Sequence, residues 1–200
     1  MDGYEDQKFM EVVEVTKKTR KPQPWFYPVP VVLVSCQSTG PANIITLAWA
    51  GVVCSNPVII SLGIRPERHS YGIIKESGGF VVNMPKASQM ALVDTCGLIS
   101  GREYNKFEKC CFTAVPGNLV RAPLIAECPV NLECRVTQVI PLGTHHLFLG
   151  EAVWMHYSEE FFVDGRFDLS SADPMVYGFS QYYRLGELIG RHGESILRKR

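Results

Sequence analysis

The chain has 200 residues, of which 46% are apolar and 20% are charged. This length supports one domain with a full hydrophobic core, and the balance of residue types excludes a disordered chain. The 20 basic and 20 acidic residues give a formal net charge of zero. A protein that works mainly by neutralising nucleic-acid phosphates or anionic lipids is therefore excluded, and we expect neither nucleic acid nor membrane as a partner.

No part of the sequence predicts a membrane span or a secretion signal. No apolar run reaches the roughly 18 residues that a membrane span needs. The first ten residues, MDGYEDQKFM, are polar and acidic, with no apolar stretch behind a basic start. We therefore expect a cytoplasmic protein.

Seven cysteines are scattered along the chain without a C-x-x-C pair. Their odd number and the missing secretion signal predict free thiols in a reducing compartment, packed as small apolar side chains. A metal site formed by Cys128, Cys134, His145 and His146 is the alternative, but these residues lack the usual spacing of zinc ligands. We predict no metal centre.

In chain order, the first notable feature is the stretch from Pro22 to Pro30, which holds four prolines and three aromatic residues. Its prolines exclude a central strand or a helix interior. We expect residues 1–30 to form an extended lead-in arm. This arm either reaches a dimer partner or packs as a loop on its own chain.

Six β-rich runs follow, and each is bounded by Gly, Pro, Asn or Ser. They are Val31–Cys36, Ile44–Cys54, Val58–Ile64, Phe80–Asn83, Val130–Ile140 and Leu147–Tyr157. Two helices are predicted between them. The first is Tyr71–Glu76, with Ser70 as its N-cap and Ser77-Gly78-Gly79 as its stop, and the second is Ser88–Ile99, with one buried stripe.

Strands dominate this pattern, and regular β-α-β alternation is absent. A doubly wound parallel sheet is therefore disfavoured. We predict a mainly β, single domain over residues 1–200, built as an antiparallel Greek-key barrel with short helical inserts.

Several common catalytic motifs are missing from the sequence. It has no G-x-G-x-x-G, no G-x-x-x-x-G-K-[ST], no G-x-S-x-G and no H-E-x-x-H. A separate dinucleotide-binding domain, nucleotide triphosphate hydrolysis and the common nucleophile and zinc mechanisms are therefore not supported. A bound organic cofactor is therefore a good place to look for the chemistry of this protein.

The block from Asn43 to Pro85 carries the strongest functional signal. Asn43, Thr46 and Trp49 lie three residues apart on an apolar segment. Because odd spacing on a strand would divide them between two faces, the chain must bend there, as a segment that wraps a ligand does. Further on, Ser70 opens a predicted helix, whose free N–H groups form a ready site for phosphate. Arg65, Arg68 or Lys106 can add positive charge to that site.

The same block resembles the flavin-reductase-like family, which includes the flavoredoxins and has the FMN-binding split-barrel fold. Three further segments are similar to family motifs in the same order. They are LISGREYNKF (Leu98–Phe107), LGTHHLFLGE (Leu142–Glu151) and YRLGELIG (Tyr183–Gly190). The resemblance therefore covers about Val31 to Gly190, nearly the whole chain.

The resemblance implies a set of residues that bind FMN. Asn43, Trp49 and the backbone around them would line the ring and ribityl chain, Ser70 and Lys106 would hold the phosphate, and Tyr177 would close the pocket. His145 would lie near the ring and act as the catalytic residue, since only the first of the two adjacent histidines fits the motif. The full predicted set is Asn43, Thr46, Leu47, Ala48, Trp49, Ala50, Ser61, Arg65, Ser70, Lys106, His145 and Tyr177.

Each of these residues also has a purely structural interpretation. Trp49 could fill the core, Lys106 could be a solvated residue at a helix end, and His145 could be a hydrogen-bonded structural histidine. Asn43 could be a turn residue, and Ser70 an ordinary N-cap, which is compatible with phosphate binding.

The function implied by the resemblance is an NAD(P)H-dependent flavin oxidoreductase that works as a homodimer. Hydride would pass from NADH or NADPH to bound FMN and on to an acceptor. An alternative is a flavoredoxin-like carrier that exchanges electrons with a partner protein. A flavin-binding protein with a storage or structural role is a third possibility.

Overall fold

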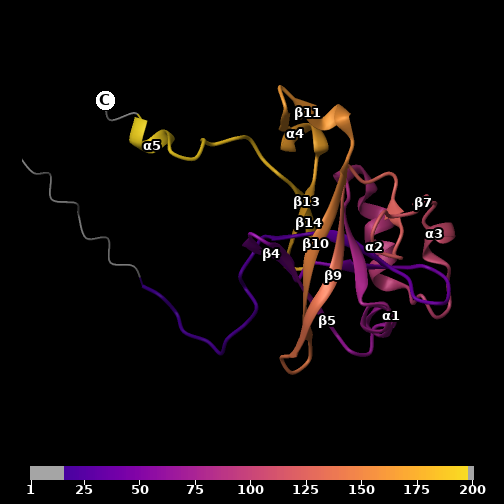
Figure 1. The fold of residues 1–200 in the computed structure, drawn as a ribbon. Helices are drawn as coiled ribbons and strands as arrows, with labels where there is room; N and C mark the ends of the chain where they lie inside the picture. Colours follow the sequence, from indigo (N-terminus) through magenta and orange to yellow (C-terminus); the bar gives the residue numbers. More distant parts are fainter. Residues whose placement is uncertain (1–15, 198–200) are drawn as a thin grey trace, which may run out of the picture.

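A seven-stranded antiparallel sheet carries most of the fold in the computed structural model, which describes residues 16–197 (Figure 1). The strand order across the sheet is β3-β2-β6-β9-β10-β5-β4. The strands are β2 (Val32–Cys36), β3 (Asn43–Leu47), β4 (Ala50–Ser55), β5 (Val58–Ile64), β6 (Gly79–Met84), β9 (Val130–Pro141) and β10 (His146–Tyr157). The prediction of a mainly β, antiparallel fold is confirmed.

The sheet curls into a half-barrel, and the reason lies in its connectivity. Strands β3 and β4 occupy the two opposite edges of the sheet, yet only Ala48 and Trp49 separate them in the chain. The edges must therefore approach each other at this point, which we call the seam. The N–H of Gly63 on β5 donates to the carbonyl of Trp49 at 2.8 Å, which extends the β4–β5 pairing into the seam.

The seam corrects one predicted element and confirms another expectation. Ile44–Cys54, expected to be one strand, is divided into β3 and β4. The bend expected from the spacing of Asn43, Thr46 and Trp49 lies at Ala48 and Trp49. The division is needed because β3 and β4 form the two opposite edges of the sheet, and one continuous strand cannot lie at both edges.

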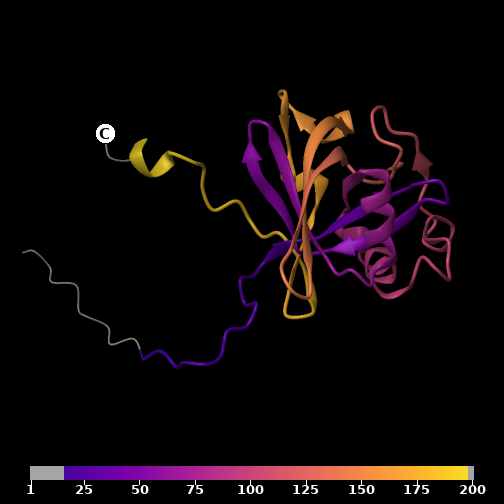
Figure 2. The same ribbon diagram turned by 60° about the horizontal axis from the view of Figure 1, so that its bottom comes forward.

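Helices cover one side of the half-barrel (Figure 2). They are α1 (His69–Ser77), the 3-10 turn η1 (Ala87–Gln89), α2 (Met90–Leu98) and α3 (Lys106–Lys109). Helix α1 ends at Gly78, whose φ of 67° is the left-handed conformation that glycine adopts easily. This agrees with the predicted stop.

The predicted N-cap of α1 is wrong. Arg68 occupies the N-cap position, without a side-chain capping bond, and Ser70 is the second residue of the helix. The Ser70 hydroxyl instead accepts a hydrogen bond from Asn43 Nδ2 at 2.8 Å. The hydroxyl oxygen of Ser70, which would accept the capping bond, is therefore bonded to Asn43 on β3.

A second, three-stranded sheet pairs a strand near the start of the described chain with two strands near its end. It has the order β1 (Val29–Pro30), β13 (Met175–Gly178) and β14 (Gln181–Arg184). Residues 16–28, before β1, contain no helix or strand. The start of this segment, and the segment that follows β14 and ends in α5 (Glu194–Leu197), extend away from the sheets (Figures 1 and 2), whereas Tyr27 packs against Trp49 and Tyr177. Residues 1–15 and 198–200 of the predicted arm and domain lie outside the described residues.

Several short elements that the sequence did not predict complete the described chain. They are β7 (Ala114–Val115), β8 (Leu124–Ile125), η2 (Glu159–Phe161), β11 (Phe162–Val163), β12 (Arg166–Phe167) and α4 (Leu169–Ala172). Among residues 16–197, no helix is both long and apolar enough to cross a membrane.

The core has two main parts. Leu62, Phe80 and Phe148 fill the inside of the half-barrel, and Leu33 and Val93 belong to a second cluster between the sheet and the helices. All seven cysteines are free thiols, and five of them are buried, as predicted. Burial raises the pKa of Cys36 and of Cys134 to about 12, so these thiols are protonated at neutral pH.

Candidate functional site

A continuous cleft runs along the seam and under the helices. It consists of two adjoining cavities of about 460 and 300 Å³, which share Ile45, Arg68, Gly97 and Leu98 as walls. We call the larger one the aromatic cavity and the smaller one the cationic cavity, after the side chains that line them. Both volumes lie within the range of small-molecule sites.

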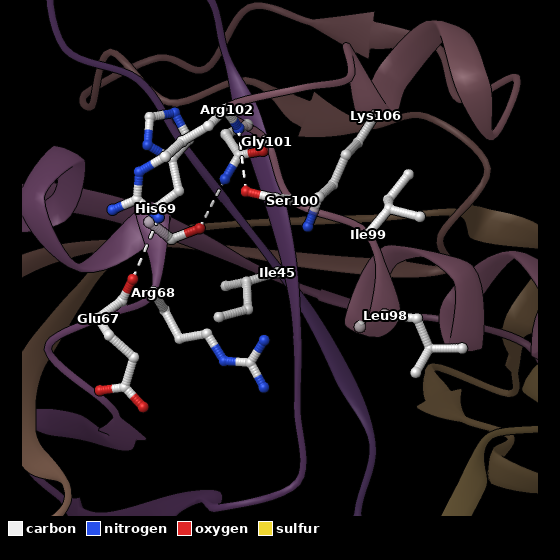
Figure 3. Close-up of a pocket in the computed structure, with 13 residues that line it drawn as sticks. Ile45, Glu67, Arg68, His69, Leu98, Ile99, Ser100, Gly101, Arg102 and Lys106 are labelled. Carbon is white, nitrogen blue, oxygen red and sulfur yellow. Dashed lines mark hydrogen bonds between the residues drawn. The ribbon is translucent and has the colours of Figure 1, made fainter.

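The cationic cavity gathers positive charge from three separate segments (Figure 3). Arg68 precedes α1, Arg102 lies in the turn after α2, and Lys106 opens α3. The ion pairs found among residues 16–197 leave these three side chains without a carboxylate partner. Arg102 instead donates to the carbonyl of Glu67 at 3.2 Å. This charge is therefore available to an anionic ligand.

Lys106 is buried at the back of this cavity, with 4% of its surface exposed. Its Nζ donates to the carbonyl of Cys96 at 2.6 Å, which leaves two of its three donors for a ligand. Desolvation lowers the pKa of Lys106, and the nearby Arg68 acts in the same direction. A buried ammonium with one neutral partner gains more from a bound anion than a solvated lysine does.

Asn43 and Ser70 form the opposite wall of the cationic cavity, joined by their 2.8 Å hydrogen bond. The first turn of α1 contains no acidic residue, so the N–H groups and the positive end of this helix are not compensated there. The wall is tight, because a Cβ on Gly101 would lie 2.1 Å from Asn43 Oδ1. Glycine at this position is therefore needed for Asn43 to reach Ser70.

The aromatic cavity is lined by rings from both ends of the described chain. Tyr27 stacks beside Trp49 with ring centroids 6.3 Å apart and an angle of 26° between the planes. Tyr177 on β13 and Tyr182 on β14 also line the cavity. The Tyr182 hydroxyl donates to Asp94 Oδ1 at 3.0 Å, which ties β14 to α2. Such a slot suits a flat aromatic ligand.

The two adjacent histidines face different environments. His145 lines the aromatic cavity, where its Nε2 accepts from Arg65 Nε at 3.3 Å. Desolvation, and then the positive charge of Arg65, lower the pKa of His145, so the ring is neutral at pH 7. His146 Nδ1 is paired with the Tyr71 hydroxyl at 2.8 Å, outside the cavity lining.

The cleft brings together ten of the twelve predicted residues. Asn43, Ser70 and Lys106 line the cationic cavity, and the others line the aromatic cavity, namely Thr46, Leu47, Ala48, Trp49, Arg65, His145 and Tyr177. Ala50 and Ser61 are not among the lining residues. Ala50 packs against the barrel core, and the Ser61 hydroxyl donates to the Gly51 carbonyl at 3.2 Å.

Other lining residues were missed by the sequence interpretation. Arg102 belongs to the LISGREYNKF segment that drew attention to Lys106, so its signal was present. His69 directly precedes Ser70 and lines the same cavity. Tyr27, Asp94 and Tyr182 had no local signal, because they reach the aromatic cavity through long-range pairing and packing.

The arrangement can therefore bind a ligand with a flat aromatic body and an anionic end. Known proteins with a similar sequence and fold agree with this geometry. The family model described as "Flavin reductase like domain" matches residues 26–186.

Two solved structures are similar to this chain, each at 30% sequence identity. The flavoredoxin from Methanosarcina acetivorans superposes with a TM-score of 0.85, over 90% of this chain and 97% of that protein. The flavoredoxin of Desulfovibrio vulgaris (Miyazaki F) gives a TM-score of 0.84, over 90% and 99%.

A curated relative adds a named activity. The ferric-chelate reductase (NAD(P)H) of Archaeoglobus fulgidus is 34% identical over 104 residues, which are 50% of this chain and 58% of the reductase. The family match spans most of the chain and agrees with the curled antiparallel sheet. The chain therefore belongs to the flavin reductase-like family.

Proposed function

We propose that this protein is an FMN-binding oxidoreductase that takes hydride from NADH or NADPH and passes electrons to an acceptor. The observation that carries the proposal is the cationic cavity, in which Arg68, Arg102 and Lys106 outnumber the one acidic lining residue, Glu67, and which adjoins an aromatic slot. FMN has the same two parts, a flat ring system and a terminal phosphate. When bound, it would supply the two-electron chemistry, and the protein would supply orientation and electrostatics.

The residues of the cationic cavity fit a phosphate group. Lys106, Arg68 and Arg102 would donate charge-assisted hydrogen bonds to it. The N–H groups of the first turn of α1, and the Ser70 hydroxyl, would add neutral donors. The buried position of Lys106 favours an ordered phosphate, because bulk water cannot screen that charge fully.

His145 would act at the ring end of the cleft. As a neutral imidazole beside Arg65, it can hold a proton on one nitrogen and accept a hydrogen bond on the other. His145→Gln is expected to slow reduction by NADH or NADPH at least about tenfold, while FMN affinity changes less than twofold. Stopped-flow absorbance and calorimetric titration measure the two quantities separately.

The nicotinamide would have to stack in the aromatic cavity, because the sequence holds no separate dinucleotide-binding motif. Similarity to a reductase named for NAD(P)H supports this part of the proposal. The 30% identity to two flavoredoxins supports the second candidate, a carrier whose FMN is reduced only by a partner protein.

One spectroscopic experiment tests both candidates. The purified protein, loaded with FMN, is given NADH and then NADPH without oxygen. Rapid bleaching of the oxidised flavin bands supports the reductase. Bands that persist with both nucleotides, but bleach with a reduced redox protein, support the carrier. A protein that takes up no FMN would overturn both.

The proposal includes a homodimer and a cytoplasmic location. Exposed apolar residues on the two outlying segments, Phe26 and Ile189 among them, favour contact with a second copy. Seven free cysteines favour a reducing compartment. Light scattering should give about twice the 22.4 kDa mass of one chain, and a monomer would contradict the dimer.

A further inference from the structure

Two buried cysteines lie in contact beside the cationic cavity. Cys96 is on α2 and Cys110 directly follows α3, and both side chains are fully buried. The Cys96 thiol donates to the Cys110 Sγ, with the two sulfurs 3.4 Å apart. In the described part of the chain, no other two cysteine sulfurs lie within hydrogen-bonding distance. A disulfide bond is about 2.0 Å long, so these two sulfurs need to approach by only about 1.4 Å to form one.

The pair is linked by hydrogen bonds to the buried ammonium of the cavity. Lys106 Nζ donates to the Cys96 carbonyl at 2.6 Å, and the Cys110 N–H donates to the Lys106 carbonyl at 3.1 Å. Gly97 and Leu98, which follow Cys96, are walls of both the cationic and the aromatic cavity. A covalent bond between α2 and the end of α3 would therefore displace Lys106 relative to the other walls.

The two thiols differ in how they can meet an oxidant. Burial raises the pKa of Cys96, so this thiol is protonated in the closed structure, and a protonated thiol is a poor nucleophile. Helix α3 has only four residues, which is too short to be stable without its packing. Cys111, the next residue after Cys110, is already exposed. Local opening of the end of α3 would therefore bring Cys110 to the surface while Cys96 stays in place.

We propose that Cys96 and Cys110 form a redox-sensitive thiol pair, which hydrogen peroxide converts into a disulfide that lowers the affinity of the cationic cavity for its anionic ligand. The effect on FMN rests on the proposed function, whereas the disulfide itself does not. Hydrogen peroxide forms when a reduced flavin passes two electrons and two protons to oxygen, so the proposed reaction would supply the oxidant in the neighbouring cleft. Redox-sensing disulfides of this transient kind occur in reducing compartments.

The oxidation takes place in two balanced steps. In the first, the Cys110 thiolate attacks one oxygen of hydrogen peroxide, the O–O bond breaks, and the other oxygen leaves as hydroxide, which takes up the thiol proton to become water. Cys110 is then a sulfenic acid. In the second, after α3 closes, the Cys96 sulfur attacks the Cys110 sulfur, the S–O bond breaks, and the oxygen leaves as water with the Cys96 proton. The two thiols lose two electrons and two protons, and peroxide is reduced to two molecules of water.

Mass spectrometry of the whole, FMN-free protein after treatment with hydrogen peroxide tests the disulfide. The remaining free thiols are blocked with iodoacetamide in denaturant before digestion. We expect a peptide pair in which Cys96 is joined to Cys110 and which dithiothreitol separates. Cys111→Ser makes the assignment to Cys110 unambiguous and should keep the cross-link. A wild-type protein whose Cys96 and Cys110 are both still blocked by iodoacetamide, or are joined to other cysteines, would overturn the pair.

Cysteine variants provide the controls for this experiment. Cys96→Ala should abolish the cross-link and leave Cys110 to oxidise alone. Cys134→Ala is the matched control, because Cys134 is an equally buried cysteine in the core of the half-barrel, and it should keep the cross-link. Loss of the cross-link in Cys134→Ala as well would contradict a specific pair.

Calorimetric titration with FMN tests the effect on the cavity. The oxidised wild type should have a Kd about tenfold higher than the reduced protein, because a displaced Lys106 would lose a charge-assisted hydrogen bond. Dithiothreitol should restore the original Kd, which it would not do for a protein that peroxide had damaged. Cys96→Ala, treated in the same way, should keep its Kd within twofold.

The remaining outcomes separate this inference from the proposed function. An oxidised protein that carries the disulfide but binds FMN as tightly as the reduced one would overturn the effect on the cavity. A reduced protein that binds no FMN would overturn the proposed function, and with it the effect on FMN affinity, whereas mass spectrometry would still decide whether the two thiols are a redox-sensitive pair.

Discussion

Two polar clusters in this molecule differ in how their charge is compensated. On the outer face of β9, the buried carboxylate of Glu133 accepts hydrogen bonds from the backbone N–H groups of Asn118, Leu119 and Val120, at 2.7 to 2.8 Å. It also pairs with His156 Nε2 at 2.7 Å. In the cationic cavity, Lys106 has one neutral protein partner, the Cys96 carbonyl.

The difference separates a structural cluster from a binding site. A charge whose hydrogen bonds are all satisfied by the protein stabilises the fold and has little left to offer a ligand. A buried charge with unused hydrogen-bond donors lowers the stability of the free protein, and a bound anion restores that stability. Glu133 is thus expected to govern folding, and Lys106 to govern ligand affinity.

The largest effect is expected at Glu133. Glu133→Gln would replace one acceptor oxygen by an NH₂ group, so at least one of the four donors loses its partner. We expect the free energy of unfolding to fall by about 3 kcal/mol. Urea unfolding measures this, and FMN affinity should change little. Exposed Glu76→Gln is the control, and a Glu133→Gln protein as stable as the wild type would refute the structural role.

Lys106→Met tests the opposite cluster. Loss of the buried ammonium should weaken FMN binding by about 30-fold, because a charge-assisted hydrogen bond contributes about 2 kcal/mol. The free energy of unfolding should stay equal or rise, since a desolvated charge is removed. Lys109→Met, an exposed residue of the same helix, is the control. A Lys106→Met protein that is less stable than the wild type but binds FMN normally would show that Lys106 stabilises the fold and does not govern ligand affinity.

Gly101→Ala tests whether the close packing of Gly101 against Asn43, in the wall of the cationic cavity, is required. The added Cβ would lie 2.1 Å from Asn43 Oδ1, so the buried Asn43 side chain would have to leave Ser70. We expect a loss of about 1.5 kcal/mol in the free energy of unfolding and weaker FMN binding.

Gly72→Ala provides the matched comparison for this substitution. Gly72 lies within α1, and its added Cβ would meet no atom within 4 Å. A gain of up to about 1 kcal/mol in the free energy of unfolding is therefore expected there. Equal thermal stability of the two variants would argue against a tight wall at Gly101.

The sequence predicted these regions to different degrees. Strand β5 was predicted at its observed bounds, and the cationic cavity was partly predicted, because Ser70 and Lys106 lie in short motifs. Tyr27 and Tyr182 were not predicted, since they reach the aromatic cavity only through the pairing of β1, β13 and β14. Distant pairings of this kind leave no periodic signal in a single sequence.

Glu133 escaped prediction for a related reason. Strand alternation places Leu132 and Cys134 toward the barrel core, which puts Glu133 on the outer face, where a carboxylate is normally solvated. Its donors lie in a loop that precedes it by 13 to 15 residues. No spacing rule links a strand carboxylate to the backbone of such a loop. The structure was needed to show that the residue is buried and satisfied.

The smallest expected effect is the pH dependence that distinguishes the clusters. Desolvation acts to raise the pKa of Glu133, but the hydrogen bonds from His156 and from three N–H groups outweigh it and hold the pKa below its ordinary value. A carboxyl whose folded pKa is depressed stabilises the fold above its unfolded pKa of about 4.3, and this contribution is lost as the pH falls further.

Wild-type stability should therefore fall more steeply below pH 5 than that of Glu133→Gln, whereas Lys106→Met should follow the wild type. Parallel curves for wild type and Glu133→Gln, measured by urea unfolding between pH 3 and 7, would mean that the Glu133 carboxylate is not preferentially stabilised in the folded state.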